Sequence, residues 1–120
     1  MWFCLQPLAR AGALGVLLAF SFAARDAAEA QGDAKSGRAK AESVCAVCHG
    51  IDGLAKIAEA PNLAGQNEAY LIAQLQAFKA GDRKNEMMSV VIQDLSDADI
   101  ENLAAYYSAI EISVSKPPAR

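Results

Sequence analysis

The feature that most constrains this chain is the pentapeptide Cys45-Ala46-Val47-Cys48-His49. It holds the only histidine of the sequence, and the only cysteine outside it is Cys4, near the N-terminus. A small domain buries a modest fraction of its surface, so domains of this size are commonly stapled by disulfides, a metal or a cofactor. The two thiols and the imidazole within five residues therefore indicate which of these stabilising groups the chain uses.

Two interpretations of the pentapeptide fit the rest of the sequence poorly. A structural zinc site needs about four ligands, usually in two separated pairs, and this chain offers no second pair of Cys or His. A dithiol redox motif follows a strand in a βαβ setting. Residues 33–44, ahead of Cys45, are instead rich in alanine and lysine and have the composition of a helix.

Covalent haem attachment is the third interpretation, and Cys-x-x-Cys-His is its recognised pattern. The thiols of Cys45 and Cys48 would form thioethers with the two vinyl groups on one edge of the porphyrin. The imidazole of His49 would turn under the ring and ligate the iron. We therefore predict one haem c, attached through Cys45 and Cys48, with His49 as an iron ligand.

The first 30 residues are predicted to be a secretory signal peptide that is cleaved. Residues 11–24 are apolar and uncharged, but the run is short for a membrane span, which needs roughly 20 residues. Residues 28–30 form a small-x-small pattern of the kind signal peptidase cuts. The alternative is an uncleaved N-terminal anchor. We expect a periplasmic monohaem domain over residues 31–113 and a flexible C-terminal tail over residues 114–120.

Helical patterns fill most of that domain, so we predict an all-α fold of about four to five helices. A first helix is expected over residues 32–48, with Asp33 as a possible N-cap. Gly37 lies inside this helix, either because two helices cross closely there or as a tolerated surface glycine. The turn-forming residues of 50–65 predict a loop that needs a haem face to lie on.

The second half of the domain contains two further helical segments with a short one between them. Residues 66–80 are predicted to form a helix, with Asn67 as its N-cap and Gly81 just past its end. Residues 82–95 read as a loop that passes into a short helix. Ser96 then caps a last helix, whose apolar stripe is Ile100, Leu103, Ala104, Tyr107 and Ile110.

The sixth position of the iron has two candidate ligands, Met87 and Met88, the only methionines after Met1. A methionine thioether would close this position and favour the reduced iron. Both methionines could instead pack in the core, which is the commoner fate of methionine. Adjacent residues point in different directions in regular structure, so we expect one of them to ligate and the other to pack.

The sequence resembles the class I c-type cytochromes, nearest to the small bacterial cytochrome c-553 and cytochrome c-4 group. The resemblance runs in consistent order over most of the chain after residue 30. It is carried by Cys45-Ala-Val-Cys48-His49-Gly50, Asp52-Gly53, Pro61-Asn-Leu-Ala-Gly-Gln66, Tyr70-Leu71, Gln74-Leu75, Phe78, Gly81, Met87-Met88, Leu95-Ser-Asp-x-Asp-Ile100 and Leu103-Ala-Ala-Tyr-Tyr107.

This resemblance implies a cytochrome c fold, with helices wrapped around one covalently attached haem. It implies that the carbonyl of Pro61 accepts the ring N–H of His49, which orients a metal-bound imidazole. It places the distal ligand on Met88. Many relatives have proline before the methionine pair where this chain has Glu86, which keeps Met87 as an alternative. It also implies that Gly37 meets the last helix near Tyr106 or Tyr107.

The expected function is one-electron transfer between redox proteins through a low-spin haem ligated by His49 and Met88. No catalytic base, nucleophile or substrate pocket is indicated, so we expect an electron-transfer protein rather than an enzyme. The alternative is a haem c subunit of a periplasmic dehydrogenase or oxidase complex. A ligand-binding or peroxidase-like haem protein would require that neither methionine ligates the iron.

The expected partners are redox proteins, a donor and an acceptor, that dock weakly with electrostatic guidance. The formal net charge of −3 is a weak indication that these partners carry a basic patch. The absence of a basic stripe argues against nucleic acid as a partner. We expect no membrane span in the mature form, and a monomer or a weak dimer.

Overall fold

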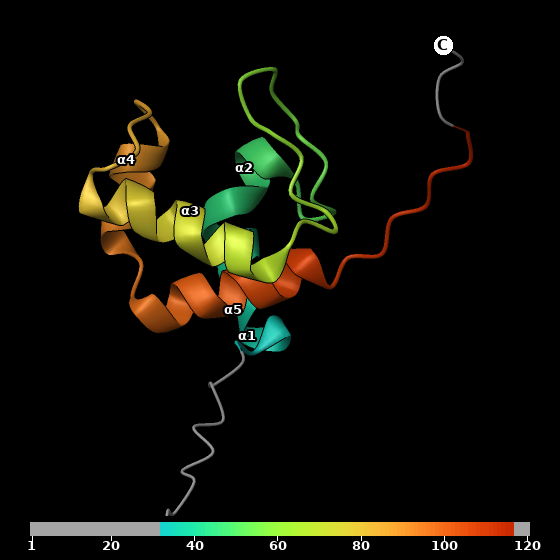
Figure 1. The fold of residues 1–120 in the computed structure, drawn as a ribbon, viewed down its shortest axis with the longest axis horizontal. Coiled ribbons are helices and arrows are strands. Elements are labelled where there is room, and N and C mark those ends of the chain that lie inside the picture. Colours follow the sequence, from blue (N-terminus) through green and yellow to red (C-terminus); the bar gives the residue numbers. More distant parts are fainter. Residues whose placement is uncertain (1–31, 117–120) are drawn as a thin grey trace, which may run out of the picture.

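The computed structural model describes residues 32–116, which are helices and connecting loops without a strand (Figure 1). The all-α prediction is therefore confirmed. The predicted signal peptide, residues 1–30, and Cys4 lie outside the described residues, as do residues 117–120 of the predicted tail. The helices are α1 (Ala34–Lys40), α2 (Ala46–His49), α3 (Glu68–Ala80), α4 (Met88–Val91) and α5 (Asp97–Ser108), with a π turn at Ala41–Cys45 and a 3₁₀ turn at Ile92–Asp94.

The first predicted helix is a composite that runs two residues later at its start and one residue further at its end. It begins at Ala34 because the carboxylate of Asp33 accepts hydrogen bonds from the backbone N–H groups of Lys35 and Ser36. A π turn then leads into α2, which ends at His49 because Gly50 has a φ of 74°. Single π turns within α-helices are frequent at functional sites, and this one ends at Cys45, the first cysteine of the pair.

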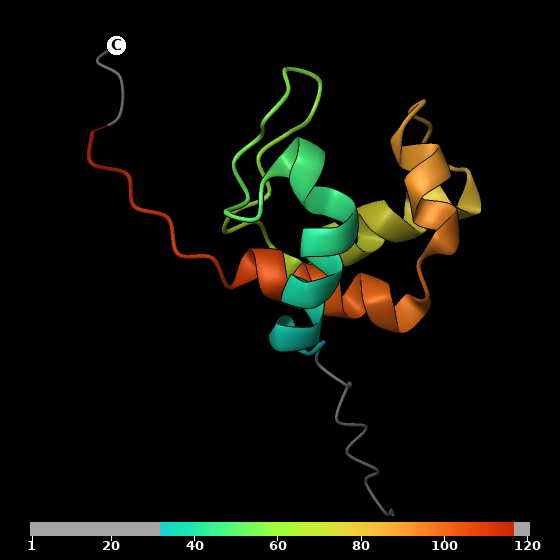
Figure 2. The same cartoon turned by 180° about the vertical axis from the view of Figure 1, so that it is seen from behind.

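Helices α1 and α5 cross, and Gly37 is buried at the crossing (Figure 2). A Cβ atom at this position would overlap the carbonyl group of Asn102 and approach the Cβ atom of Tyr106 to 2.9 Å. The structure therefore favours the close-crossing explanation of this glycine. The crossing involves Asn102 and Tyr106, so Gly37 meets α5 near Tyr106, one of the two residues that the resemblance implied.

The predicted caps of the later helices are present. The side chain of Asn67 accepts from the backbone N–H of Tyr70 and starts α3, and Gly81 ends it in the left-handed conformation with a φ of 82°. Ser96 and Asp99 form a reciprocal capping box at the start of α5. Both helices therefore begin where a side chain satisfies backbone N–H groups that the helix itself leaves free.

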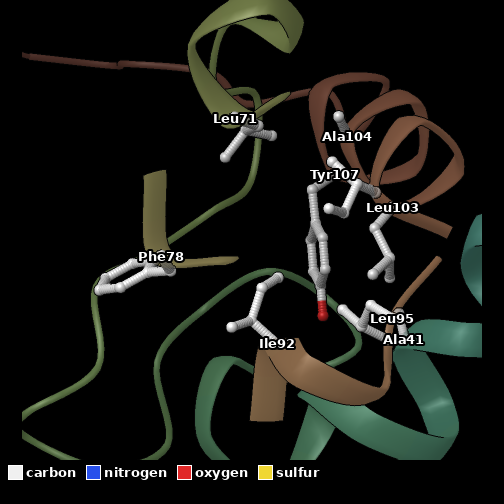
Figure 3. Packing of buried hydrophobic residues seen from close by; sticks show 9 residues of the cluster. Ala41, Leu71, Phe78, Ile92, Leu95, Leu103, Ala104 and Tyr107 are labelled. Atoms are coloured by element: carbon white, nitrogen blue, oxygen red, sulfur yellow. The ribbon is translucent and has the colours of Figure 1, made fainter. Parts of the chain in front are cut away.

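The hydrophobic core lies where α3 and α5 pack together with the 3₁₀ turn (Figure 3). Ile92, Ile100 and Leu103 are its largest fully buried side chains. The other members are Ala41, Leu71, Phe78, Leu95, Ala104 and Tyr107. Most of them also line the site described next: Leu71, Phe78, Leu95, Leu103, Ala104 and Tyr107.

Two segments stand on the same side of the layer formed by α3 and α5 (Figures 1 and 2). One is α2 with the loop over residues 50–66, and the other is α4 with the loop that leads into it. Within residues 32–116, no helix has the length and apolar character needed to cross a membrane. Residues 111–116 follow α5 as an exposed segment without helix.

Candidate functional site

A cavity of about 320 Å³ lies between these two segments, over α3 and α5. Most of its walls are apolar, contributed by Leu63, Leu71, Leu75, Phe78, Val91, Leu95, Leu103 and Ala104. The cavity also brings together the residues that the sequence singled out. These are Cys45, Cys48, His49, Pro61, Met87 and Met88.

The cysteine pair and the histidine share one face of the helical segment that ends at His49. Cys48 and His49 follow Cys45 by three and four residues, which places side chains on the same side of a helix. All three residues line the cavity. Val47 lies on the opposite face and is 81% exposed. The two cysteines are free thiols and half-buried. Burial, with a smaller contribution from Cys48, raises the pKa of the Cys45 thiol to about 11.

The imidazole of His49 is buried and held in one orientation. Its Nδ1 lies 2.9 Å from the carbonyl oxygen of Pro61. A carbonyl only accepts, so Nδ1 must be the protonated nitrogen and donates this hydrogen bond. In the neutral ring the lone pair is then on Nε2, and the ring lines the cavity. This tautomer is the one that ligates a metal through Nε2.

Both methionines line the cavity from the start of α4, but they differ in burial. Met87 is 46% exposed, whereas Met88 is half-buried and packs against the hydrophobic core. The side-chain oxygen of Asn85 accepts the backbone N–H groups of Met87 at 3.1 Å and Met88 at 3.0 Å. Asn85 therefore fixes the backbone of both residues, in a chain that has Glu86 rather than proline before the pair.

The donor set and the shape of the cavity fit haem c and argue against zinc. The Cys48 thiol and the His49 ring face one cavity from α2, the Cys45 thiol faces it from the end of the π turn, and a thioether faces it from α4. The largely apolar lining suits a flat macrocycle. Among the described residues, no group of three or more His, Cys, Asp or Glu side chains could hold a metal ion. The alternative of a structural zinc site therefore finds no support in the arrangement of side chains.

Two tyrosines of α5 attach the backbone just after His49 to the core. The phenol of Tyr107 donates to the carbonyl oxygen of Gly50 at 3.1 Å, and that of Tyr106 donates to the carbonyl oxygen of Ile51 at 2.7 Å. The Gly65 N–H donates to the carbonyl oxygen of Tyr107 at 2.9 Å. Both ends of the loop that carries Pro61 are thus tied to α5.

Comparison with known proteins agrees with this geometry. The family model described as cytochrome c oxidase, cbb3-type, subunit III matches residues 32–106. Cytochrome c4 of Stutzerimonas stutzeri is 44% identical over 96 residues, which is 72% of this chain and 45% of that protein. The chain belongs to the class I c-type cytochromes of the c4 group. Its cofactor is haem c with iron, and Cys45 and Cys48 fit the attachment motif of the family.

Other relatives differ from this cytochrome in length. It spans less than half of the cytochrome c4 proteins that it matches. By contrast, cytochrome c-554(548) of Halomonas halodenitrificans is 42% identical over 83 residues, which cover 67% of this chain and 99% of that protein. A one-domain relative of similar extent therefore exists alongside the longer ones.

Solved structures show the same fold. The crystal structure of reduced cytochrome c4 from Pseudomonas stutzeri superposes with a TM-score of 0.63 at 43% identity, over 69% of this chain and 48% of that one. Thiosulfate dehydrogenase from Marichromatium purpuratum superposes with a TM-score of 0.64 at 36% identity, over 76% of this chain and 23% of that one. The prediction of a cytochrome c fold is confirmed.

Some residues around the cavity escaped the sequence analysis. Asn85 is one, although an asparagine three residues before a short helix is a recognisable capping signal. Tyr107 is predicted in the apolar stripe of its helix and as a possible neighbour of Gly37, but its hydrogen bond to Gly50 has no signal in the sequence. Arg83 and Lys84, which also line the cavity, follow Gly81 in a stretch that read only as a polar loop.

Proposed function

We propose that this cytochrome is a periplasmic monohaem one-electron carrier, with a low-spin haem attached through Cys45 and Cys48 and ligated by His49 and Met88. The observation that carries the proposal is the convergence of these four side chains on one apolar cavity. They come from two segments on opposite sides of the cavity, so the arrangement suits a macrocycle held between a proximal and a distal ligand.

Each residue has a defined part in this function. Bound haem supplies a one-electron change at its iron. The Pro61 carbonyl keeps the His49 ring in the tautomer that presents Nε2. The thioether of Met88 favours the reduced iron and leaves no open position for a substrate. The apolar walls exclude water, which limits reorganisation when the charge on the iron changes. The chain thus binds the haem, orients the His49 ring and sets the reduction potential of the iron. It performs no bond-making step during electron transfer.

Met88 is preferred to Met87 as the distal ligand because of its burial. A ligand sulfur must lie inside the cavity, and Met88 packs against the core while Met87 is 46% exposed. Backbone hydrogen bonds to Asn85 hold both residues at the start of α4. The more exposed side chain is then free to lie at the edge of the cavity.

The cellular setting of the proposal follows from the N-terminal segment and the cofactor. Residues 1–30 have the pattern of a cleaved secretory signal, and haem of this type is attached outside the cytoplasm. The mature domain is proposed to span residues 31–113 and to act as a monomer or weak dimer. Its partners would be a donor and an acceptor protein that dock transiently.

Intact mass and optical spectra of the exported protein test the proposal. In a haem-maturing host, the mature chain should carry the added mass of one haem. The oxidised protein should show the weak charge-transfer band at the red end of the visible spectrum that a thioether ligand gives. Met88→Ala should abolish this band and open the iron to carbon monoxide, and Met87→Ala should leave it intact. The reverse pattern would assign the ligand to Met87.

A second candidate function is that of a haem c subunit in a periplasmic enzyme complex. It is favoured by the structural likeness to part of thiosulfate dehydrogenase from Marichromatium purpuratum. The size of the native protein in periplasmic extract separates the two functions. A free carrier elutes alone, at the volume of the purified monomer or weak dimer. A subunit elutes with a larger partner that persists at high salt.

A further inference from the structure

The two cations that line the haem cavity, Arg83 and Lys84, have no carboxylate partner among residues 32–116. Four other cations of the described chain each pair with a carboxylate at 2.9–3.2 Å: Arg38, Lys40, Lys56 and Lys79. The remaining two, Lys35 and Lys116, do not line the cavity. Unpaired positive charge thus gathers at one place on the cavity wall, in two consecutive residues.

Arg83 is held in place at the rim of the cavity. Its guanidinium donates to the side-chain oxygen of Gln74 at 2.6 Å and lies 4.6 Å from the ring centroid of Phe78. Its backbone N–H donates to the carbonyl oxygen of Ala77 at 3.0 Å. Gln74, Phe78 and Arg83 all line the cavity. The neutral partners leave the full positive charge of Arg83 available to an anion.

Haem brings two carboxylates into this cavity as its propionates. They lie on the porphyrin edge opposite the vinyl groups, and therefore away from Cys45 and Cys48. Glu59 is the single carboxylate among the cavity-lining residues, so the cations outnumber the acidic side chains there. A guanidinium suits a carboxylate especially well because its planar array of N–H donors matches the two oxygens.

We propose that Arg83, fixed by Gln74 and Phe78, pairs with one haem propionate, and that Lys84 beside it neutralises the other. This inference rests on the proposed attachment of haem through Cys45 and Cys48, which fixes the vinyl edge. Both residues act as positioning and charge-setting groups rather than as ligands of the iron. They determine how strongly the negative propionates bias the iron toward its oxidised form.

The sign of the electrostatic effect follows from the charges. An unneutralised propionate stabilises ferric iron, which carries one more positive charge than ferrous iron. A guanidinium paired with that propionate cancels the bias and raises the reduction potential. Removal of the guanidinium lowers the potential and also raises the pKa of the released propionate. On acidification, the reduction potential of the variant therefore begins to rise at a higher pH than that of the wild type.

Spectroelectrochemical titration over a range of pH tests this proposal with charge-matched variants of the holoprotein. Arg83→Gln should lower the reduction potential and move its pH-dependent rise to higher pH. At pH 7 the ratio of ferrous to ferric protein should fall by about threefold, a modest value because water screens a charge at the rim. Arg83→Lys should retain most of the wild-type potential. Lys35→Gln removes the same charge outside the cavity and should leave the pH profile unchanged.

Two outcomes would overturn the proposal. Equal shifts in Arg83→Gln and Arg83→Lys would mean that the lost contacts with Phe78 and Gln74 matter, and not the charge. A response of Arg83→Gln no larger than that of Lys35→Gln would mean that no propionate lies beside Arg83. Lys84→Gln keeps both contacts of Arg83 and therefore tests the effect of charge separately. It should lower the reduction potential more than Lys35→Gln does.

The same samples distinguish this proposal from the assignment of the iron ligands. The charge-transfer band and the added haem mass report on Met88 and the cysteines. Both should be unchanged in every Arg83 and Lys84 variant. A missing band in the wild type would refute the Met88 ligand, while the pH profile would still decide whether Arg83 pairs with a propionate.

Discussion

The phenol of Tyr107 donates a 3.1 Å hydrogen bond to the carbonyl oxygen of Gly50, the residue that follows His49. Tyr107 is 2% exposed, so the bond is made inside the core. It joins the last helix to the end of the haem-attachment motif across 57 residues of chain. The position of His49 therefore depends on the packing of α5 as well as on the local helix.

Replacing Tyr107 with Phe should alter how stability depends on pH. Burial is the main cause that raises the pKa of this phenol above its ordinary value of 10.0. A raised folded-state pKa contributes stability that is complete below the unfolded pKa and is lost as pH rises above it. Tyr107→Phe should thus lose about 1 kcal/mol at neutral pH but decline less steeply above pH 10. Denaturant unfolding at several pH values measures both effects. An equally steep alkaline decline would exclude this phenol as the titrating group.

Replacing Gly37 with Ala should destabilise the protein, although alanine is the better helix former. Helix propensity alone favours the substitution by about 1 kcal/mol. The added Cβ would overlap the carbonyl group of Asn102, and forced overpacking typically costs about 1–3 kcal/mol. Thermal unfolding of the holoprotein should show a lower midpoint. The matched control is Ala39→Gly on the exposed face of α1, which should cost about 1 kcal/mol. A stabilised Gly37→Ala protein would contradict the close crossing.

Alkylation of the haem-free chain should reveal the buried state of Cys45. The pKa of its thiol is raised to about 11 by burial, and only the thiolate reacts. At a pH near 8, the folded haem-free chain should react at Cys45 about a hundredfold more slowly than the chain in urea, as a difference of two pKa units implies. Peptide mapping by mass spectrometry measures the two rates. Equal rates would show that Cys45 is not buried before haem is attached.

Replacing Asn85 with Ala should weaken the distal ligand without removing it. The variant loses two hydrogen bonds to the backbone of Met87 and Met88, so the thioether becomes easier to displace. Titration with imidazole, followed by loss of the charge-transfer band, should show displacement at lower concentration than in the wild type. Asn67→Ala removes a comparable cap from α3 and costs about 1 kcal/mol. It should leave the imidazole titration unchanged, and equal displacement in both variants would argue against a specific role for Asn85.

The features that could be predicted from sequence are those set by neighbouring residues. Asn67, Gly81 and Ser96 cap their helices as predicted, because a cap depends on side chains within three or four residues. The pentapeptide predicted its own chemistry for the same reason. Pro61 was reached only through family resemblance, since nothing local links it to His49, 12 residues before it.

The features that escaped prediction depend on how distant segments meet. The π turn over Ala41–Cys45 has the composition of an ordinary helix, so its extra residue per turn is invisible in the sequence. The contact of Asn102 with Gly37 follows from how closely α1 and α5 cross, and the hydrogen bond of Tyr107 follows from how α5 packs against the chain after α2. The sequence indicates only that Arg83 and Lys84 lie in a polar loop, whereas the structure shows that both line a largely apolar cavity.

The way in which the haem cavity is walled has a consequence for biogenesis. α4 contains no buried residue, and the buried positions of 50–66 are the two glycines Gly50 and Gly53. These two segments therefore contribute few fully buried side chains, whereas most of the buried core comes from α3, α5 and the 3₁₀ turn. A chain that reaches its compartment without its cofactor would present both segments to proteases. Attachment of haem would then also act as quality control, sparing the matured molecules and marking the others for degradation.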